Sequence, residues 1–70
     1  MQITINGKHH DIGENTSIAA VMKQRGFKPG MAVAELNYEI IPNEEWHTTI
    51  LKEGDVLEIV AFMGGGAYHA

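Results

Sequence analysis

Three consecutive glycines, Gly64, Gly65 and Gly66, follow the most apolar strand-like segment of the chain, residues 56–62. Because glycine has no Cβ, such a run loses much conformational entropy on ordering and adds no side-chain packing. The same property lets bare backbone enter a narrow enzyme cleft, where a side chain would prevent close approach to a reactive carboxylate. We therefore interpret residues 64–70 as a flexible arm that another enzyme threads or processes. The plainer alternative is an ordinary disordered chain end.

The side chains that most often carry chemistry form no catalytic or metal-binding pattern. The four histidines are His9, His10, His47 and His69. None is spaced from another as in an HExxH helix, and two adjacent histidines in a strand point to opposite faces. Carboxylates at 44–45 and 53–55 belong to solvated turns, and the absence of cysteine excludes a thiolate nucleophile, a disulfide and a thiolate-bound zinc. We predict no catalytic residue, no metal ion and no cofactor bound by the chain itself.

Length and charge narrow the class of protein. Seventy residues make one small domain, close to the lower limit for a core that folds without disulfides or metals. Five Lys and Arg against nine Asp and Glu give a net charge of −4, which disfavours nucleic acid and suits a basic protein partner. No apolar stretch is long enough to span a membrane, and the N-terminus lacks a signal peptide. We predict a cytoplasmic protein with neither nucleic acid nor membrane as a partner.

The N-terminal half predicts a hairpin followed by a helix. Residues 1–6 alternate apolar and polar side chains, as in a half-buried strand, and the dipeptide Asn6-Gly7 indicates a tight turn into an antiparallel strand at about 8–12. A helix over 17–25 follows, with Asn15 or Thr16 as its N-cap, an apolar face of Ile18, Val21 and Met22, and Gly26 as its stop. This helix is expected to cover the sheet.

The C-terminal half predicts three further strands. Residues 31–36 and 39–41 are expected to pair across the turn Asn37-Tyr38, and Pro42 leads into a single turn that places Trp46 in the core. A turn at 52–55 then starts the last strand, 56–62, which we predict to be buried on both faces and parallel to the first. The fold class is α+β: one domain over 1–63 with a mixed sheet of four to five strands covered by one main helix.

The order of these elements, the segments 31–37 and 41–46, the turn Glu53-Gly54-Asp55 and the glycine-rich end resemble the ThiS sulfur carriers of thiamine biosynthesis. The resemblance spans residues 1–66 and implies the β-grasp, ubiquitin-like fold. It implies that the terminal glycine carboxylate is adenylated by a ubiquitin-activating-like adenylyltransferase of the ThiF/MoeB type, which uses ATP and Mg. The product becomes a thiocarboxylate that gives its sulfur to an enzyme such as thiazole synthase. A carrier of this kind is a cosubstrate and has no active site of its own.

Transferred to this sequence, the resemblance makes Gly66 the adenylated and thiocarboxylated residue and Gly64 and Gly65 the arm. Phe62 and Met63 precede the arm, where a small apolar patch would serve partner docking, although either side chain could instead fold back onto the sheet.

The sequence departs from the family after Gly66, where carriers of this type usually end. Residues 67–70, Ala-Tyr-His-Ala, form a four-residue extension that must be removed before Gly66 can react. Similar carriers of other pathways are stored with a short tail that a JAMM-type metalloprotease removes. The extension therefore leaves open a carrier for cysteine, homocysteine or molybdopterin synthesis, and a ubiquitin-like modifier of protein lysines. An RNA-binding β-grasp module would need a basic face, and the five scattered basic residues and the net charge of −4 disfavour it.

Overall fold

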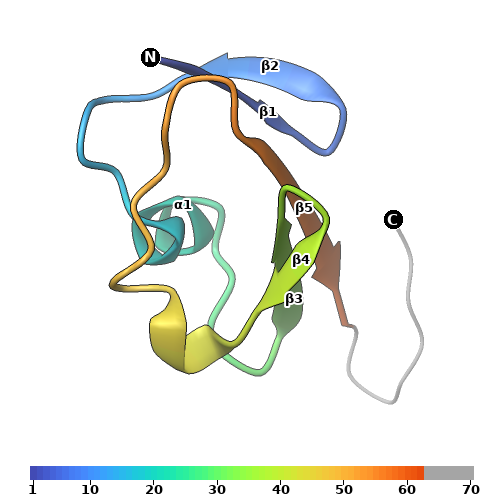
Figure 1. Ribbon diagram of the computed structural model, residues 1–70. Coiled ribbons are helices and arrows are strands. Elements are labelled where there is room, and N and C mark those ends of the chain that lie inside the picture. The colour runs from blue at the N-terminus through green and yellow to red at the C-terminus, as the bar shows by residue number, and fades with distance from the viewer. Residues whose placement is uncertain (63–70) are drawn as a thin grey trace.

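Over the described residues, the chain forms a mixed five-stranded sheet with strand order β2-β1-β5-β3-β4 and one α-helix (Figure 1). The computed structural model describes residues 1–62, so the predicted domain boundary between 63 and 64 lies outside the described residues. The elements are β1 (Gln2–Ile5), β2 (Lys8–Asp11), α1 (Ile18–Gln24), β3 (Ala32–Leu36), β4 (Glu39–Ile41), the 3₁₀ turn η1 (Asn43–Glu45) and β5 (Val56–Ala61).

The first hairpin forms as predicted. β1 and β2 pair antiparallel from Gln2–Asp11 to Ile5–Lys8. Asn6 and Gly7 have φ angles of 48° and 82°, and two consecutive positive values are typical of the type I′ turn that matches the twist of a tight hairpin.

The helix α1 is capped by a residue other than those predicted. The Ser17 hydroxyl oxygen accepts a hydrogen bond from the backbone N–H of Ala20, so Ser17 is the N-cap, and the prediction of Asn15 or Thr16 was wrong. The Thr16 hydroxyl instead donates to the Gly13 carbonyl at 2.6 Å. The Thr16 carbonyl accepts the N–H of Leu51, which fixes the chain before the helix begins. Gly26 ends the helix with φ +84°, as predicted.

The second hairpin joins β3 and β4 through Asn37 and Tyr38, both with positive φ. Tyr38 adopts the left-handed region at φ 72°, which is uncommon for a bulky residue and is usually occupied by glycine or asparagine. The chain then passes through η1 to Trp46, which is buried as predicted.

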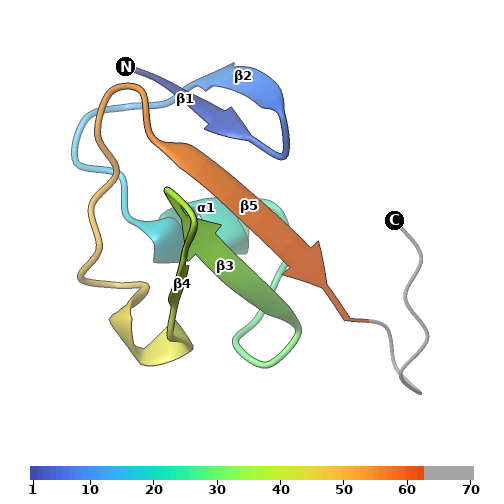
Figure 2. The same ribbon diagram turned by 45° about the vertical axis from the view of Figure 1, so that its right-hand side comes forward.

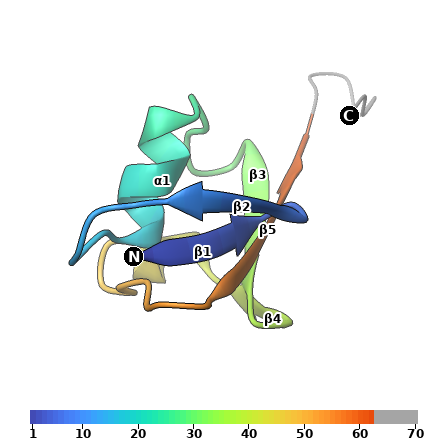
Figure 3. The same cartoon turned by 90° about the horizontal axis from the view of Figure 1, so that it is seen from above.

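β5 is the central strand. It pairs parallel with β1 at Thr4–Val56 and Ile5–Leu57, as predicted, and antiparallel with β3 from Leu57 to Ala61 (Figure 2). The prediction that this strand is buried on both faces was wrong: Leu57 and Ile59 are buried, but the side chain of Val60 is 50% exposed. Figure 3 shows α1 on one side of the sheet, and no second layer among the described residues covers the opposite face.

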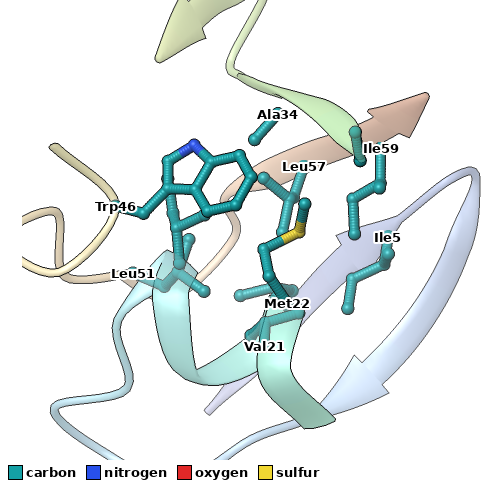
Figure 4. Packing of buried hydrophobic residues seen from close by; sticks show 11 residues of the cluster. Ile5, Val21, Met22, Ala34, Trp46, Leu51, Leu57 and Ile59 are labelled. Atoms are coloured by element: carbon teal, nitrogen blue, oxygen red, sulfur yellow. The ribbon is translucent and has the colours of Figure 1, made fainter. Parts of the chain in front are cut away.

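The core lies between α1 and the inner sheet face. Its buried members are Ile3, Ile5, Ile18, Val21, Met22, Ala32, Ala34, Trp46, Leu51, Leu57 and Ile59. In Figure 4 the indole of Trp46 points toward the residues from α1 and β5. The indole N–H donates to the Ile41 carbonyl at 3.0 Å, so a large aromatic side chain is buried without an unsatisfied donor. No helix in the part of the chain that the structure describes is long and apolar enough to cross a membrane.

Candidate docking face and chain exit

The packed domain holds the chain as far as Phe62. The N–H of Phe62 donates to the Met31 carbonyl at 2.7 Å, which extends the contact with the β3 side one residue beyond β5. The Phe62 side chain is 50% exposed and does not belong to the core cluster. The predicted docking residue Met63, the arm residues Gly64 and Gly65, and the predicted reacting residue Gly66 lie outside the described residues.

The other edge of β5 is held by a side chain. Backbone pairing with β1 stops at Leu57, whose carbonyl accepts the N–H of Asn6 at 2.9 Å. From there the Asn6 side chain continues the contact: Oδ1 accepts the N–H of Ile59 at 2.7 Å, and Nδ2 donates to the Ile59 carbonyl at 3.3 Å. β5 is therefore hydrogen-bonded on both sides as far as Ile59, and on the β3 side as far as Ala61.

An exposed apolar surface lies on the sheet face opposite α1. We call Val33, Glu35, Ile40, Glu58 and Val60 the outer face. Cross-strand register places them together, because Val33 pairs with Val60, and Glu35 pairs with both Ile40 and Glu58. They line a shallow depression of about 350 Å³. Ile40 is 67% and Val60 50% exposed, and exposed apolar side chains that gather in one patch are typical of an interaction site.

The outer face has an acidic centre. Glu35 and Glu58 lie directly opposite one another across β3 and β5, and like charges in that position are unfavourable. No basic residue lines the depression. An arrangement that costs stability and leaves apolar groups in water favours a partner surface that is apolar with a basic group at its centre.

Sequence reasoning missed the outer face. The side chains of Glu58 and Val60 point to the outer face, and Phe62, a predicted docking residue, follows Val60 by two positions. Phe62 therefore extends the outer face beyond the C-terminal end of β5. The signal for Val33 and Ile40 was present, since the turn at residues 37–38 fixes the register of β3 and β4. It was overlooked because the last strand was expected to be covered on both sides.

Within residues 1–62, the histidine and carboxylate side chains are exposed or half-buried. No group of three or more histidine, cysteine, aspartate or glutamate side chains there could hold a metal ion. His9 is exposed and His10 is half-buried, on opposite faces of β2. The half-buried Asp55 serves the turn before β5: one carboxylate oxygen accepts the N–H of Lys52 and the other accepts Nδ2 of Asn37.

A five-stranded mixed sheet covered by one helix, with parallel first and last strands, defines the β-grasp, ubiquitin-like class of protein. The crystal structure of the thiamine biosynthesis protein ThiS from Geobacter metallireducens has this fold. It superposes with a TM-score of 0.78 at 30% sequence identity, over 94% of this chain and 100% of that one. The predicted fold is confirmed.

The model of the ThiS family matches residues 2–66, and the chain belongs to this family. The sulfur carrier protein ThiS of Bacillus subtilis is 34% identical over 65 residues, which cover 91% of this chain and 98% of that protein. A thiazole synthase of Paramagnetospirillum magneticum is 33% identical over 70 residues, which cover all of this chain and 22% of that protein. The chain thus spans about a fifth of the length of the curated thiazole synthases that it matches.

Proposed function

We propose that this chain is a sulfur carrier that supplies the thiazole moiety of thiamine, and that its reacting group is the carboxylate of Gly66. The observation that carries the proposal is that the family match ends at Gly66, the last of the three glycines that follow β5 in the sequence. The names of the Bacillus subtilis carrier and the Geobacter metallireducens protein support this function.

The chemistry needs an activated acyl group, because a carboxylate is a poor electrophile. A Gly66 carboxylate oxygen attacks the α-phosphorus of ATP and pyrophosphate leaves. A sulfur nucleophile then attacks the carbonyl carbon, the bond from carbon to the adenylate oxygen breaks, and AMP departs. ATP and Mg belong to a ThiF/MoeB-type adenylyltransferase in this scheme. The chain supplies no catalytic residue and acts as a cosubstrate in the cytoplasm.

Docking and reaction are assigned to separate parts of the chain. The outer face, extended by Phe62, binds the activating enzyme, and Gly66 follows Phe62 by four residues. An extended segment of four residues spans at most about 14 Å, so the adenylation site must lie within that distance of the docked sheet edge. Because Asn6 and β3 hold β5, the point from which this distance is counted is fixed.

Thiazole synthase is the proposed sulfur acceptor. The whole of this chain, including residues 67–70, matches a segment of the Paramagnetospirillum magneticum thiazole synthase. One polypeptide of that kind holds a carrier-like segment together with the named enzyme, which favours the thiazole pathway over cysteine, homocysteine or molybdopterin synthesis. We propose that a JAMM-type protease removes residues 67–70 before activation.

Pyrophosphate exchange tests this proposal. The cognate ThiF-type enzyme, ATP and Mg are mixed with a chain ending at Gly66 or with the chain to Ala70. Exchange with the first alone is expected, equal exchange would contradict the need for tail removal, and no exchange with either would contradict the carrier function. A second assay offers the adenylate sulfide or a lysine peptide. Transfer to the lysine amine would instead identify a ubiquitin-like modifier.

A further inference from the structure

A second apolar hollow lies on the helix side of the sheet, away from the outer face. It has a volume of about 340 Å³ and lies between the end of α1, residues 26–29 and the segment around η1. Its apolar lining comes from Ala19, Met22, Phe27, Pro29 and Trp46. We call this hollow the helix groove. It is at the lower end of the range of about 300–1,000 Å³ seen for ligand pockets, which suits one anchoring side chain.

Main-chain hydrogen bonds hold the walls of the helix groove in place. The N–H of Ala19 donates to the Trp46 carbonyl at 3.0 Å, which joins α1 to the segment after η1. The N–H of Phe27 donates to the Met22 carbonyl at 2.8 Å and fixes the loop at the end of the helix. Since the indole N–H already donates to Ile41, Trp46 offers the groove an apolar surface only. The groove is therefore formed in advance, which lowers the entropic cost of binding.

Charge distinguishes the groove from the rest of the surface. Two of the five basic residues in the chain, Lys23 and Lys28, line it, and none of the nine acidic residues does. Both lysines are exposed and come from different elements, the last turn of α1 and the following loop. The two lysines line the groove together with its apolar residues. They therefore suit a ligand with one apolar side chain in the groove and a carboxylate on each side of it.

We propose that the helix groove binds an acidic peptide segment of a partner protein, with one large apolar side chain in the groove and flanking carboxylates on Lys23 and Lys28. The inference goes beyond the sulfur-carrier proposal and does not depend on it. Because the groove and the outer face lie on opposite sides of the sheet and differ in charge, two partners can bind the domain at once. The groove would then tether the carrier while the outer face is occupied.

The test uses three short peptides and the full chain labelled with ¹⁵N. The probe is acetyl-Glu-Asp-Phe-Asp-Glu-amide; one control replaces phenylalanine by alanine, and the other replaces all four acidic residues by lysine. In an NMR titration, the probe should shift the amides of residues 19–28 and 43–47 and leave those of the outer face unchanged. Each control peptide should bind about tenfold more weakly or worse at low ionic strength.

Matched variants separate the groove from nonspecific attraction. Joint Lys23→Glu and Lys28→Glu changes should weaken the probe about tenfold, and Lys52→Glu should not. Ala19→Leu should fill the groove and prevent binding of the probe. Ala20 is exposed and does not line the groove, so Ala20→Leu should bind the probe like the parent and is the control for effects of leucine on the helix. Equal binding of the lysine peptide, shifts centred on the outer face, or no shift at millimolar probe would each overturn the proposal.

Discussion

Asn6 binds the backbone of Ile59 through both ends of its side-chain amide, across 53 positions of sequence. The amide takes the place of a strand residue where β1 turns away into β2. It also satisfies a backbone N–H and C=O that the parallel pairing no longer reaches. The strand that leads to the glycines thus depends on a turn residue of the first hairpin.

Replacing Asn6 by glycine should destabilise the domain by about 1–2 kcal/mol, because the two hydrogen bonds to Ile59 are lost. Glycine keeps the positive φ of the turn without strain, so the loss combines the two hydrogen bonds with the extra entropy that glycine gives the unfolded chain. Urea unfolding measures the effect, with Gln24→Ala as an exposed control. A glycine variant as stable as the parent would show that Asn6 serves the turn alone.

Tyr38 is the opposite case, a bulky residue in the left-handed region whose side chain is 79% exposed. Its positive φ costs energy that few side-chain contacts offset. Tyr38→Gly should therefore raise the free energy of unfolding by about 0.5–1 kcal/mol. Relief of the backbone strain stabilises the folded state, and the greater entropy of the unfolded chain offsets part of that gain.

Tyr38→Ala keeps the strained φ and should change the stability by less than about 0.5 kcal/mol, which makes it the control. A fall in stability for Tyr38→Gly would mean that the phenol ring packs usefully in spite of its exposure. Thermal and urea unfolding of both variants measure the difference.

Local signals in the sequence were sufficient for much of the fold. The alternation around Ile3 and Ile5 predicted β1, and Asn6-Gly7 predicted its turn, because both depend on neighbouring residues only. The helix cap was misplaced by one or two positions. Ser17 rather than Thr16 caps α1 since a distant residue, Leu51, binds the Thr16 carbonyl.

The features of the candidate site were harder to predict because they depend on which strands become neighbours. The side chain of Asn6 reaches Ile59 only after β1 and β5 pair in parallel. Val60 lies on an exposed face because one helix covers one side of the sheet, which an apolar run alone does not reveal. The predicted arm, Gly64 to Gly66, lies outside the described residues and stays a prediction, although the family match also ends at Gly66.

Phe62→Glu should weaken binding to the activating enzyme and leave the domain folded. A central apolar anchor accounts for roughly 2 kcal/mol or more of binding, and the half-exposed Phe62 lies outside the core cluster. Calorimetric titration and circular dichroism melts, run on a chain ending at Gly66, measure both effects. Ile50→Glu, a change at a similarly exposed aliphatic residue outside the outer face, is the control.

If Phe62→Glu melts normally and binds the activating enzyme with unchanged affinity, the docking surface does not include Phe62. A sharp loss of stability would instead mean that Phe62 contributes to the packing of the domain.

Gly65→Ala or Gly66→Ala, in a chain ending at residue 66, should leave the unfolding midpoint unchanged and reduce adenylation strongly. The physical reason is that a Cβ obstructs a cleft shaped for bare backbone, while an arm beyond the packed domain contributes little to stability. Pyrophosphate exchange and thermal unfolding of the same samples are the measurements. A marked fall in the midpoint would show that the arm is part of the packed domain.

The sulfur-carrier account is tested most directly by the intact mass of the protein isolated from its native host. The account predicts a chain that ends at Gly66, with one carboxylate oxygen replaced by sulfur in a fraction of the molecules. That fraction should disappear when the ThiF-type enzyme is deleted. Two results would contradict the account while thiamine is being made. One is a protein that still carries residues 67–70, and the other is a protein that ends at Gly66 but has no sulfur-bearing form.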